Sequence, residues 1–168
     1  MFVLLRAVVW SSLLTGFLLV FVPARLLSCF GPIPALRFGG QEIFGIVVTG
    51  VGAALAVWSV LAFVFVGQGT PAPFDPPKKL VVRGPYKYVR NPIYIGAGLT
   101  LIGAAIVYRS HLILDYVAVL FLVVHLLVVW YEEPTLRRLF GDAYLAYCQR
   151  VHRWWPRLHD GSSPAVGQ

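Results

Sequence analysis

The chain has 168 residues, of which 58% are hydrophobic and only 12% are charged. A soluble domain is about half apolar and about a quarter charged, so this chain lacks the polar surface needed to cover a water-facing shell. Its net charge of +7 comes with no nucleic-acid recognition motif, and we expect the excess to face anionic lipid headgroups. Composition thus excludes a water-soluble domain, makes nucleic acid an unexpected partner, and predicts an integral membrane protein.

Four apolar runs predict transmembrane helices. Crossing a bilayer core of about 30 Å takes about 20 helical residues. The runs are 2–22, 43–66, 93–108 and 111–131. The third run is short and carries three glycines, so it spans only if it is tilted or packed inside a bundle. The first run could instead be a signal peptide, but Pro23, Arg25 and Leu26 form a poor cleavage site, and we expect a retained helix.

Positive charge gathers in two segments and predicts the orientation of the chain. Ten of the fourteen Lys and Arg lie between the second and third runs or after the last one. They are Lys78, Lys79, Arg83, Lys87, Arg90, Arg137, Arg138, Arg150, Arg153 and Arg157. Because basic segments stay on the cytoplasmic side, we expect both segments and both termini there. The loop with Arg25, Arg37 and Glu42 would then face outside.

We interpret residues 1–168 as a single membrane domain. Two N-terminal transmembrane helices (1–66) precede a basic cytoplasmic loop (67–92), a helical hairpin (93–131), an amphipathic helix (132–158) and a flexible tail (159–168). The amphipathic helix has its apolar positions at helical spacing. Two roles for it stay open. It could lie flat on the membrane with Trp154 and Trp155 as interfacial anchors, or its apolar stripe could close a pocket at the cytoplasmic mouth of the bundle.

Small residues in the second run predict close helix packing. Gly45 with Thr49, and Gly52 with Ala56, stand four residues apart, which lets two helix backbones approach closely in lipid. We expect these glycines to serve packing and not a ligand.

The segment 83–98 is dense in polar, aromatic and turn-forming residues and is the best candidate for a site. Asn91 and Pro92 are suited to the N-cap and first position of a helix. Unpaired backbone donors and a partial positive charge at such an N-terminus favour a carboxylate or a phosphate. Gly96 and Gly98 lie in the first two turns, so a flat ligand could approach the backbone there.

Two carboxylates, Glu132 and Glu133, end the last apolar run on the same predicted side. One explanation is structural, because Pro134 could open the next helix and acidic residues are favourable at a helix N-terminus. The other is functional, because carboxylates near the bilayer are costly and usually mark sites. Ribose hydroxyls or an ammonium group would be suitable partners. Both explanations stay open at this point.

Read together, these residues resemble the membrane methyltransferase superfamily that includes isoprenylcysteine carboxyl methyltransferases and phosphatidylethanolamine N-methyltransferases. The resemblance covers about the C-terminal half of the chain. It consists of Gly84, Pro85, Tyr86, then Arg90, Asn91, Pro92, Tyr94 and Gly96, then Glu132 and Glu133, then Phe140, Gly141, Tyr144, Tyr147 and Pro156. The phospholipid branch is also similar in its glycine pair, here Gly96 and Gly98, and in its acidic pair.

The resemblance implies an all-α membrane enzyme of about four transmembrane helices, with a C-terminal amphipathic helix closing a cytoplasmic-side cofactor pocket. It implies S-adenosylmethionine as cofactor, S-adenosylhomocysteine as product, and a lipid-like substrate reached from the bilayer. We assign Glu132 and Arg90 to catalysis. We assign to the cofactor Tyr88, Val89, Asn91, Pro92, Tyr94, Gly96, Gly98, Glu133 and Tyr147. We expect no metal.

One departure from the family pattern concerns Asn91, which stands where the family has histidine. An amide can still hydrogen-bond a cofactor, but it cannot carry a proton near neutral pH. Two other classes stay open. One is an NADPH-dependent oxidoreductase similar to sterol reductases, and the other is a non-catalytic membrane module.

Overall fold

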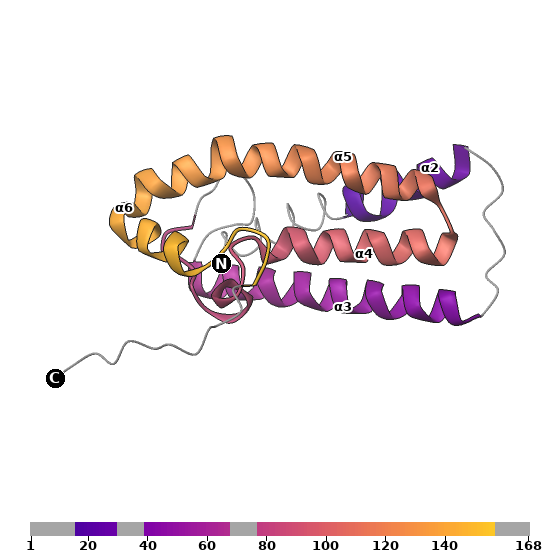
Figure 1. The fold of residues 1–168 in the computed structure, drawn as a ribbon, viewed down its shortest axis with the longest axis horizontal. Coiled ribbons are helices and arrows are strands. Elements are labelled where there is room, and N and C mark those ends of the chain that lie inside the picture. Colours follow the sequence, from indigo (N-terminus) through magenta and orange to yellow (C-terminus); the bar gives the residue numbers. More distant parts are fainter. Residues whose placement is uncertain (1–15, 30–38, 68–76, 157–168) are drawn as a thin grey trace.

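The computed structural model describes residues 16–29, 39–67 and 77–156. Within these ranges the named elements are all helical (Figure 1). In chain order they are η1 (Gly16–Phe21), α2 (Val22–Cys29), α3 (Gly40–Ala62), η2 (Phe63–Gly67), η3 (Gly84–Lys87), α4 (Pro92–Tyr108), α5 (His111–Leu127), η4 (Val128–Glu132) and α6 (Glu133–Arg150). The predicted all-α class is confirmed.

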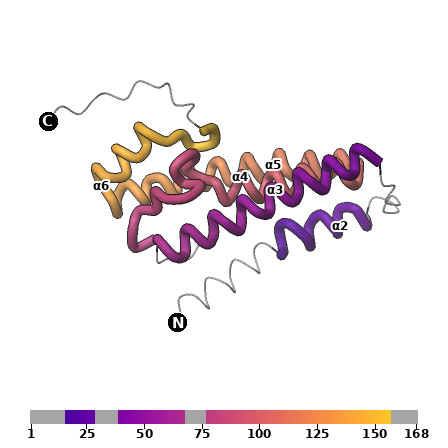
Figure 2. Tube along the Cα trace, turned by 90° about the horizontal axis from the view of Figure 1, so that it is seen from below, coloured from indigo at the N-terminus to yellow at the C-terminus, as the bar shows by residue number. Residues whose placement is uncertain are grey.

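Helices α3, α4 and α5 run side by side in alternating directions, and α2 lies beside them near one end (Figures 1 and 2). The turn between α4 and α5 is short because Arg109 takes a left-handed conformation (φ 49°), and the Ser110 hydroxyl accepts a hydrogen bond from the Ile113 amide. At this end the Arg109 guanidinium also pairs with Glu42 at the start of α3, at 2.8 Å. The basic segments lie at the opposite end.

The contact between α3 and α4 is a stripe of small residues. A Cβ on Gly52 would lie 2.7 Å from the Gly96 carbonyl oxygen, and a Cβ on Gly103 would lie 2.4 Å from the Thr49 amide nitrogen. The two backbones therefore touch, as small residues allow in helix pairs within lipid. The predicted packing role of Gly45 and Gly52 is confirmed, with Gly96 and Gly103 as their counterparts on α4.

Two helical stretches, Gly40–Gly67 and His111–Arg150, are long and apolar enough to cross a membrane. Large apolar side chains on them point outward, among them Phe44 (61% exposed) and Val119 (61%). Such a surface suits lipid and not water, so this is a membrane protein. Gly16–Ser28 and Pro92–Tyr108 are shorter apolar helices. The count of four spans stays a prediction, because residues 1–15 lie outside the described ranges.

The first helical segment extends beyond residue 22, where the sequence predicted its end. Helix continues through Pro23 as far as Cys29, so Arg25 lies in α2 and not in a loop. Pro23 is the second residue of α2 and comes two residues after the π-helical stretch η1 ends at Phe21; the wider π turn before it tolerates a residue without an amide proton. Arg37 lies outside the described residues.

The last long helix continues where the sequence predicts a break. α5 continues through η4 into the first part of α6 without a break, with a π-helical turn over Val128–Glu132 just before Pro134. A π turn absorbs the missing amide and the steric demand of proline. The path then bends sharply at Gly141, whose φ of 50° and ψ of −127° interrupt α6. α6 ends at Arg150, so the amphipathic helix is shorter than the predicted 132–158.

Candidate active site

At the basic end of the bundle, the loop before α4 forms a short, buried 3-10 turn over Gly84–Lys87. Gly84 has a φ of 60°, a conformation that glycine adopts without strain. The turn buries Tyr86, which is 7% exposed, and its carbonyl oxygen accepts a hydrogen bond from the Tyr147 hydroxyl at 2.7 Å. Burial raises the pKa of Tyr86 above the ordinary range, so its phenol stays protonated.

Helix α6 folds over this turn. Tyr144, Tyr147 and Val151 form a buried cluster, against which Leu80 of the loop is packed. The apolar stripe of α6 therefore lies on protein, although Leu139 on another face is 52% exposed. Of the two roles left open by the sequence, this packing favours a cover over the end of the bundle.

After α6 the chain returns across the start of α4 as a segment that we call the strap, residues 151–156. His152 forms a parallel bridge with Val89, and its carbonyl oxygen accepts a hydrogen bond from the Arg90 amide at 2.9 Å. The Asn91 side chain donates to the Arg153 carbonyl oxygen at 3.5 Å. Asn91 is thus the N-cap residue of α4 by position, but its side chain holds the strap and makes no capping bond.

A buried ionic cluster lies beneath the strap. Glu133, 5% exposed, accepts two hydrogen bonds from the Arg153 guanidinium, at 2.7 and 2.9 Å, and its Oε1 lies 3.2 Å from Arg90 Nη1. The hydrogen bond to Glu133 raises the pKa of Arg153. Arg90 also donates to the Cys148 sulfur, yet its buried Nε has no partner among the described residues.

Glu132 faces a different partner, the Tyr94 hydroxyl, which donates a hydrogen bond to its Oε1. Tyr94 comes from the first turn of α4 and Glu132 from η4, so this contact joins two elements. Because the helix runs on through Pro134, no helix N-terminus exists at the acidic pair for these charges to favour. The structural explanation considered above for the pair therefore does not hold.

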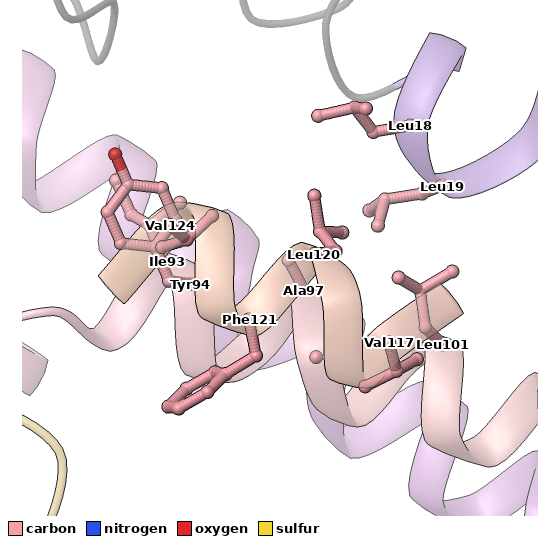
Figure 3. Close-up of a pocket in the computed structure, with 11 residues that line it drawn as sticks. Leu18, Leu19, Ile93, Tyr94, Ala97, Leu101, Val117, Leu120, Phe121 and Val124 are labelled. Atoms are coloured by element: carbon pink, nitrogen blue, oxygen red, sulfur yellow. The ribbon is translucent and has the colours of Figure 1, made fainter. Parts of the chain in front are cut away.

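An apolar cavity of ≈ 120 Å³ opens between η1, α4 and α5 (Figure 3). Its lining residues are Leu18, Leu19, Ile93, Tyr94, Ala97, Gly98, Leu101, Val117, Leu120, Phe121 and Val124. A Cβ on Gly98 would meet nothing within 4 Å, whereas one on Gly96 would lie 2.6 Å from the Ala56 amide nitrogen. Gly98 therefore leaves room at the cavity, and Gly96 serves the contact with α3.

The structure brings most of the residues predicted for the site to one end of the bundle. Tyr94 and Glu132 pair directly. Four further residues lie around the strap and the buried 3-10 turn: Arg90, Asn91, Glu133 and Tyr147. Val89 and Pro92 are buried beside them, whereas Tyr88 is 62% exposed and Gly96 faces α3. Roles of these residues toward a cofactor stay predictions.

Sequence reasoning missed three residues of this region. Arg153 was counted only as a basic residue, Trp154 only as an anchor, and Phe121 only as part of an apolar run. Their contacts join positions 20 to 33 residues apart, such as Glu133 with Arg153 and Phe121 with Trp154. The double tryptophan after a helix end was the one signal that could have pointed to them.

These features define a helical membrane protein with a buried polar cluster at one end, next to an apolar cavity. The chain belongs to the phospholipid methyltransferase family, whose sequence model matches residues 41–143. It is also similar to methanethiol S-methyltransferase 1 of Bradyrhizobium diazoefficiens, with 38% identity over 66 residues. That match covers 39% of this chain and 22% of the relative, so the chain spans only about a fifth of the relative's length.

Membership of this family confirms the resemblance noted from the sequence. It does not favour the NADPH-dependent oxidoreductase.

Proposed function

We propose that the chain transfers a methyl group from S-adenosylmethionine to a hydrophobic acceptor taken from the bilayer. The observation that carries this proposal is the position of Tyr94. Its ring lines the apolar cavity, while its hydroxyl binds Glu132 at the edge of the polar cluster. An apolar compartment and a polar compartment thus meet at one side chain, as a reaction between a lipid-soluble acceptor and a charged cofactor requires.

The residues of the polar end fit a cofactor that carries a carboxylate. Arg90 and Arg153 supply two positive charges against the single carboxylate of Glu133, and the buried Arg90 Nε is without a described partner. A cofactor carboxylate would satisfy such a donor by a charge-assisted hydrogen bond. Arg90 is therefore assigned to cofactor binding here, and Glu133 holds the two arginines in place.

S-adenosylmethionine supplies an electrophilic methyl group on a sulfonium sulfur. Methyl transfer is an in-line displacement, so the protein mainly aligns the acceptor and excludes water. In our proposal Tyr94 and Gly98 shape the place where the acceptor atom lies. Glu132 then has two tasks at its carboxylate: it orients the Tyr94 hydroxyl and accepts the proton that an S–H or N–H acceptor releases.

The acceptor class is limited by the cavity. No lysine or arginine is among the described residues that line it, so a phosphate or carboxylate would be buried there without a counter-charge from them, at high cost. Its ≈ 120 Å³ is comparable to cavities of about 150 Å³ that hold benzene. A neutral acceptor with a small apolar group is favoured, and the thiol named for the Bradyrhizobium relative belongs to that class.

We also propose that the chain crosses the membrane four times, with the site and both termini in the cytoplasm. The two basic segments share one end of the bundle, and the positive-inside rule assigns that end to the cytoplasm. In a variant that has Ser in place of Cys29 and Cys148, a cysteine introduced at Ser162 should react with an impermeant maleimide only after the cells are opened. Labelling from outside intact cells would contradict this orientation.

Calorimetric titration of the purified protein with S-adenosylhomocysteine and, separately, with NADPH tests the function. The proposal predicts saturable binding of S-adenosylhomocysteine and none of NADPH. Binding of NADPH alone would transfer the chain to the oxidoreductase class, and binding of neither would support a non-catalytic module.

A further inference from the structure

The strap ends in two tryptophans with different surroundings. Trp155 is 77% exposed. Trp154 instead packs on Phe121 of α5, with ring centroids 4.8 Å apart and planes at 53°. Its indole N–H also donates to His125 Nδ1 at 3.1 Å. Phe121 and His125 are one helical turn apart on α5, so Trp154 contacts α5 at two adjacent points.

Phe121 is at the same time a wall of the apolar cavity. It is 45% exposed, and Figure 3 shows its ring turned away from Leu18 and Leu19, at the far side of the labelled lining residues. A half-exposed ring at a cavity rim can change rotamer unless a neighbour holds it. Among the described residues, Trp154 is the aromatic neighbour in stacking range of Phe121.

The strap is fixed well enough for Trp154 to act as that neighbour. Arg153, the residue before it, makes a bidentate bond to the buried carboxylate of Glu133. His152 is held by the Arg90 amide. The backbone around Trp154 is therefore bonded to the start of α4 and to the polar cluster. This fixes the position from which the Trp154 ring packs against α5.

We propose that Trp154 is a specificity-determining residue, which limits the size of the acceptor's apolar group by holding Phe121 at the rim of the cavity. The proposal rests on the function proposed above, because it takes the cavity as the acceptor's place. Trp154 is not among the described residues that line the cavity. It acts through Phe121, and removing it should widen the cavity without altering the polar cluster.

Photolabelling in nanodiscs tests this without requiring methyl transfer. Two lipid-soluble diazirine probes are used, one on a small alkyl group and one on a bulky branched group. For each, mass spectrometry compares label on the cavity residues Val117 and Leu120 with label on the lipid-facing Val119. This ratio corrects for the amount of probe dissolved in the bilayer.

In Trp154→Ala the ratio for the bulky probe should rise about two- to tenfold, the range that an aromatic pair can supply, while the ratio for the small probe stays constant. Phe121→Ala should give the same rise, and the double variant should not exceed either single variant, because both changes remove one contact. Trp155→Ala is the matched control and should behave as wild type. Trp154→Phe, which keeps a ring on Phe121, should restore most of the selectivity.

An unchanged bulky-probe ratio in Trp154→Ala, or additive effects in the double variant, would overturn the proposal. A parallel titration with S-adenosylhomocysteine separates the two ideas. Loss of its binding in Trp154→Ala would show that the strap acts on the whole site and not on the rim, and would also overturn it. Failure of the wild type to bind S-adenosylhomocysteine would count against the proposed function, while the labelling ratios would still report on Trp154.

Discussion

Replacing Glu133 by Gln should destabilise the protein, because its carboxylate holds two arginines at a buried position. Three contacts would lose their charge, at 2.7, 2.9 and 3.2 Å. Removing one partner of a buried ion pair costs about 3–5 kcal/mol. The Arg153 side chain is 29% exposed and Arg90 only 13%, so water would relieve part of the penalty, and we expect a loss of about 2–3 kcal/mol. For a chain of this size that lowers the unfolding midpoint by about 4–12 °C.

Glu132→Gln is the matched comparison. The Gln carbonyl oxygen can still accept the hydrogen bond from Tyr94, so we expect a stability loss of less than about 1 kcal/mol together with loss of methyl transfer. Both midpoints can be read in detergent from tryptophan fluorescence, and S-adenosylhomocysteine affinity can be measured on the same preparations. If Glu133→Gln unfolded at the wild-type midpoint but bound S-adenosylhomocysteine at least tenfold more weakly, Glu133 would be a ligand and our account of the cluster would be wrong.

Three further outcomes are expected. Gly96→Ala should lose about 1–3 kcal/mol of stability, because its Cβ would lie 2.6 Å from the Ala56 backbone and overpacking has this cost. Gly98→Ala should lose no stability. Equal unfolding midpoints for the two variants would contradict the packing argument. Gly141→Ala should lower the free energy of unfolding by at least about 1 kcal/mol, because φ is 50° there and a residue with a Cβ is strained in that conformation. An unchanged unfolding midpoint would show that α6 can straighten. S-adenosylhomocysteine at a hundredfold excess over its dissociation constant should stabilise the wild type by about 2.7 kcal/mol. A melting curve that does not move with saturating ligand would refute this prediction.

The sequence predicted the helices and the general position of the site because both leave local signals. Apolar runs of membrane-spanning length predicted α3 and α5, and small residues four apart predicted the contact between α3 and α4. Pro92 predicted the start of α4 correctly. The basic segments were correctly expected to share one end of the bundle.

The sequence did not predict the features that depend on contacts between distant residues. One of the two explanations of the acidic pair took Pro134 as the start of a new helix, because a π turn that absorbs a proline leaves no local pattern. Gly96 and Gly98 looked equivalent, because only the position of α3 makes one a packing residue and leaves the other open to the cavity. The contact between Glu133 and Arg153 was not predicted, because only the return of the strap brings that guanidinium onto the carboxylate.

The central claim is that a methyl group passes to an acceptor seated in the cavity beside Gly98, and a pair of glycine variants tests it most directly. Gly98→Leu fills the open space in the cavity, whereas Gly50→Leu places the same side chain where a Cβ also meets nothing within 4 Å, but on the exposed surface of α3. Leucine favours a helix more than glycine does, so both variants should fold. The measurement is transfer of a labelled methyl group from S-adenosylmethionine to short-chain thiols and to phosphatidylethanolamine in nanodiscs. We predict that the wild type and Gly50→Leu transfer the methyl group to a thiol, and that the rate of transfer falls at least tenfold in Gly98→Leu. Equal transfer by both variants, or no transfer by the wild type, would contradict the account.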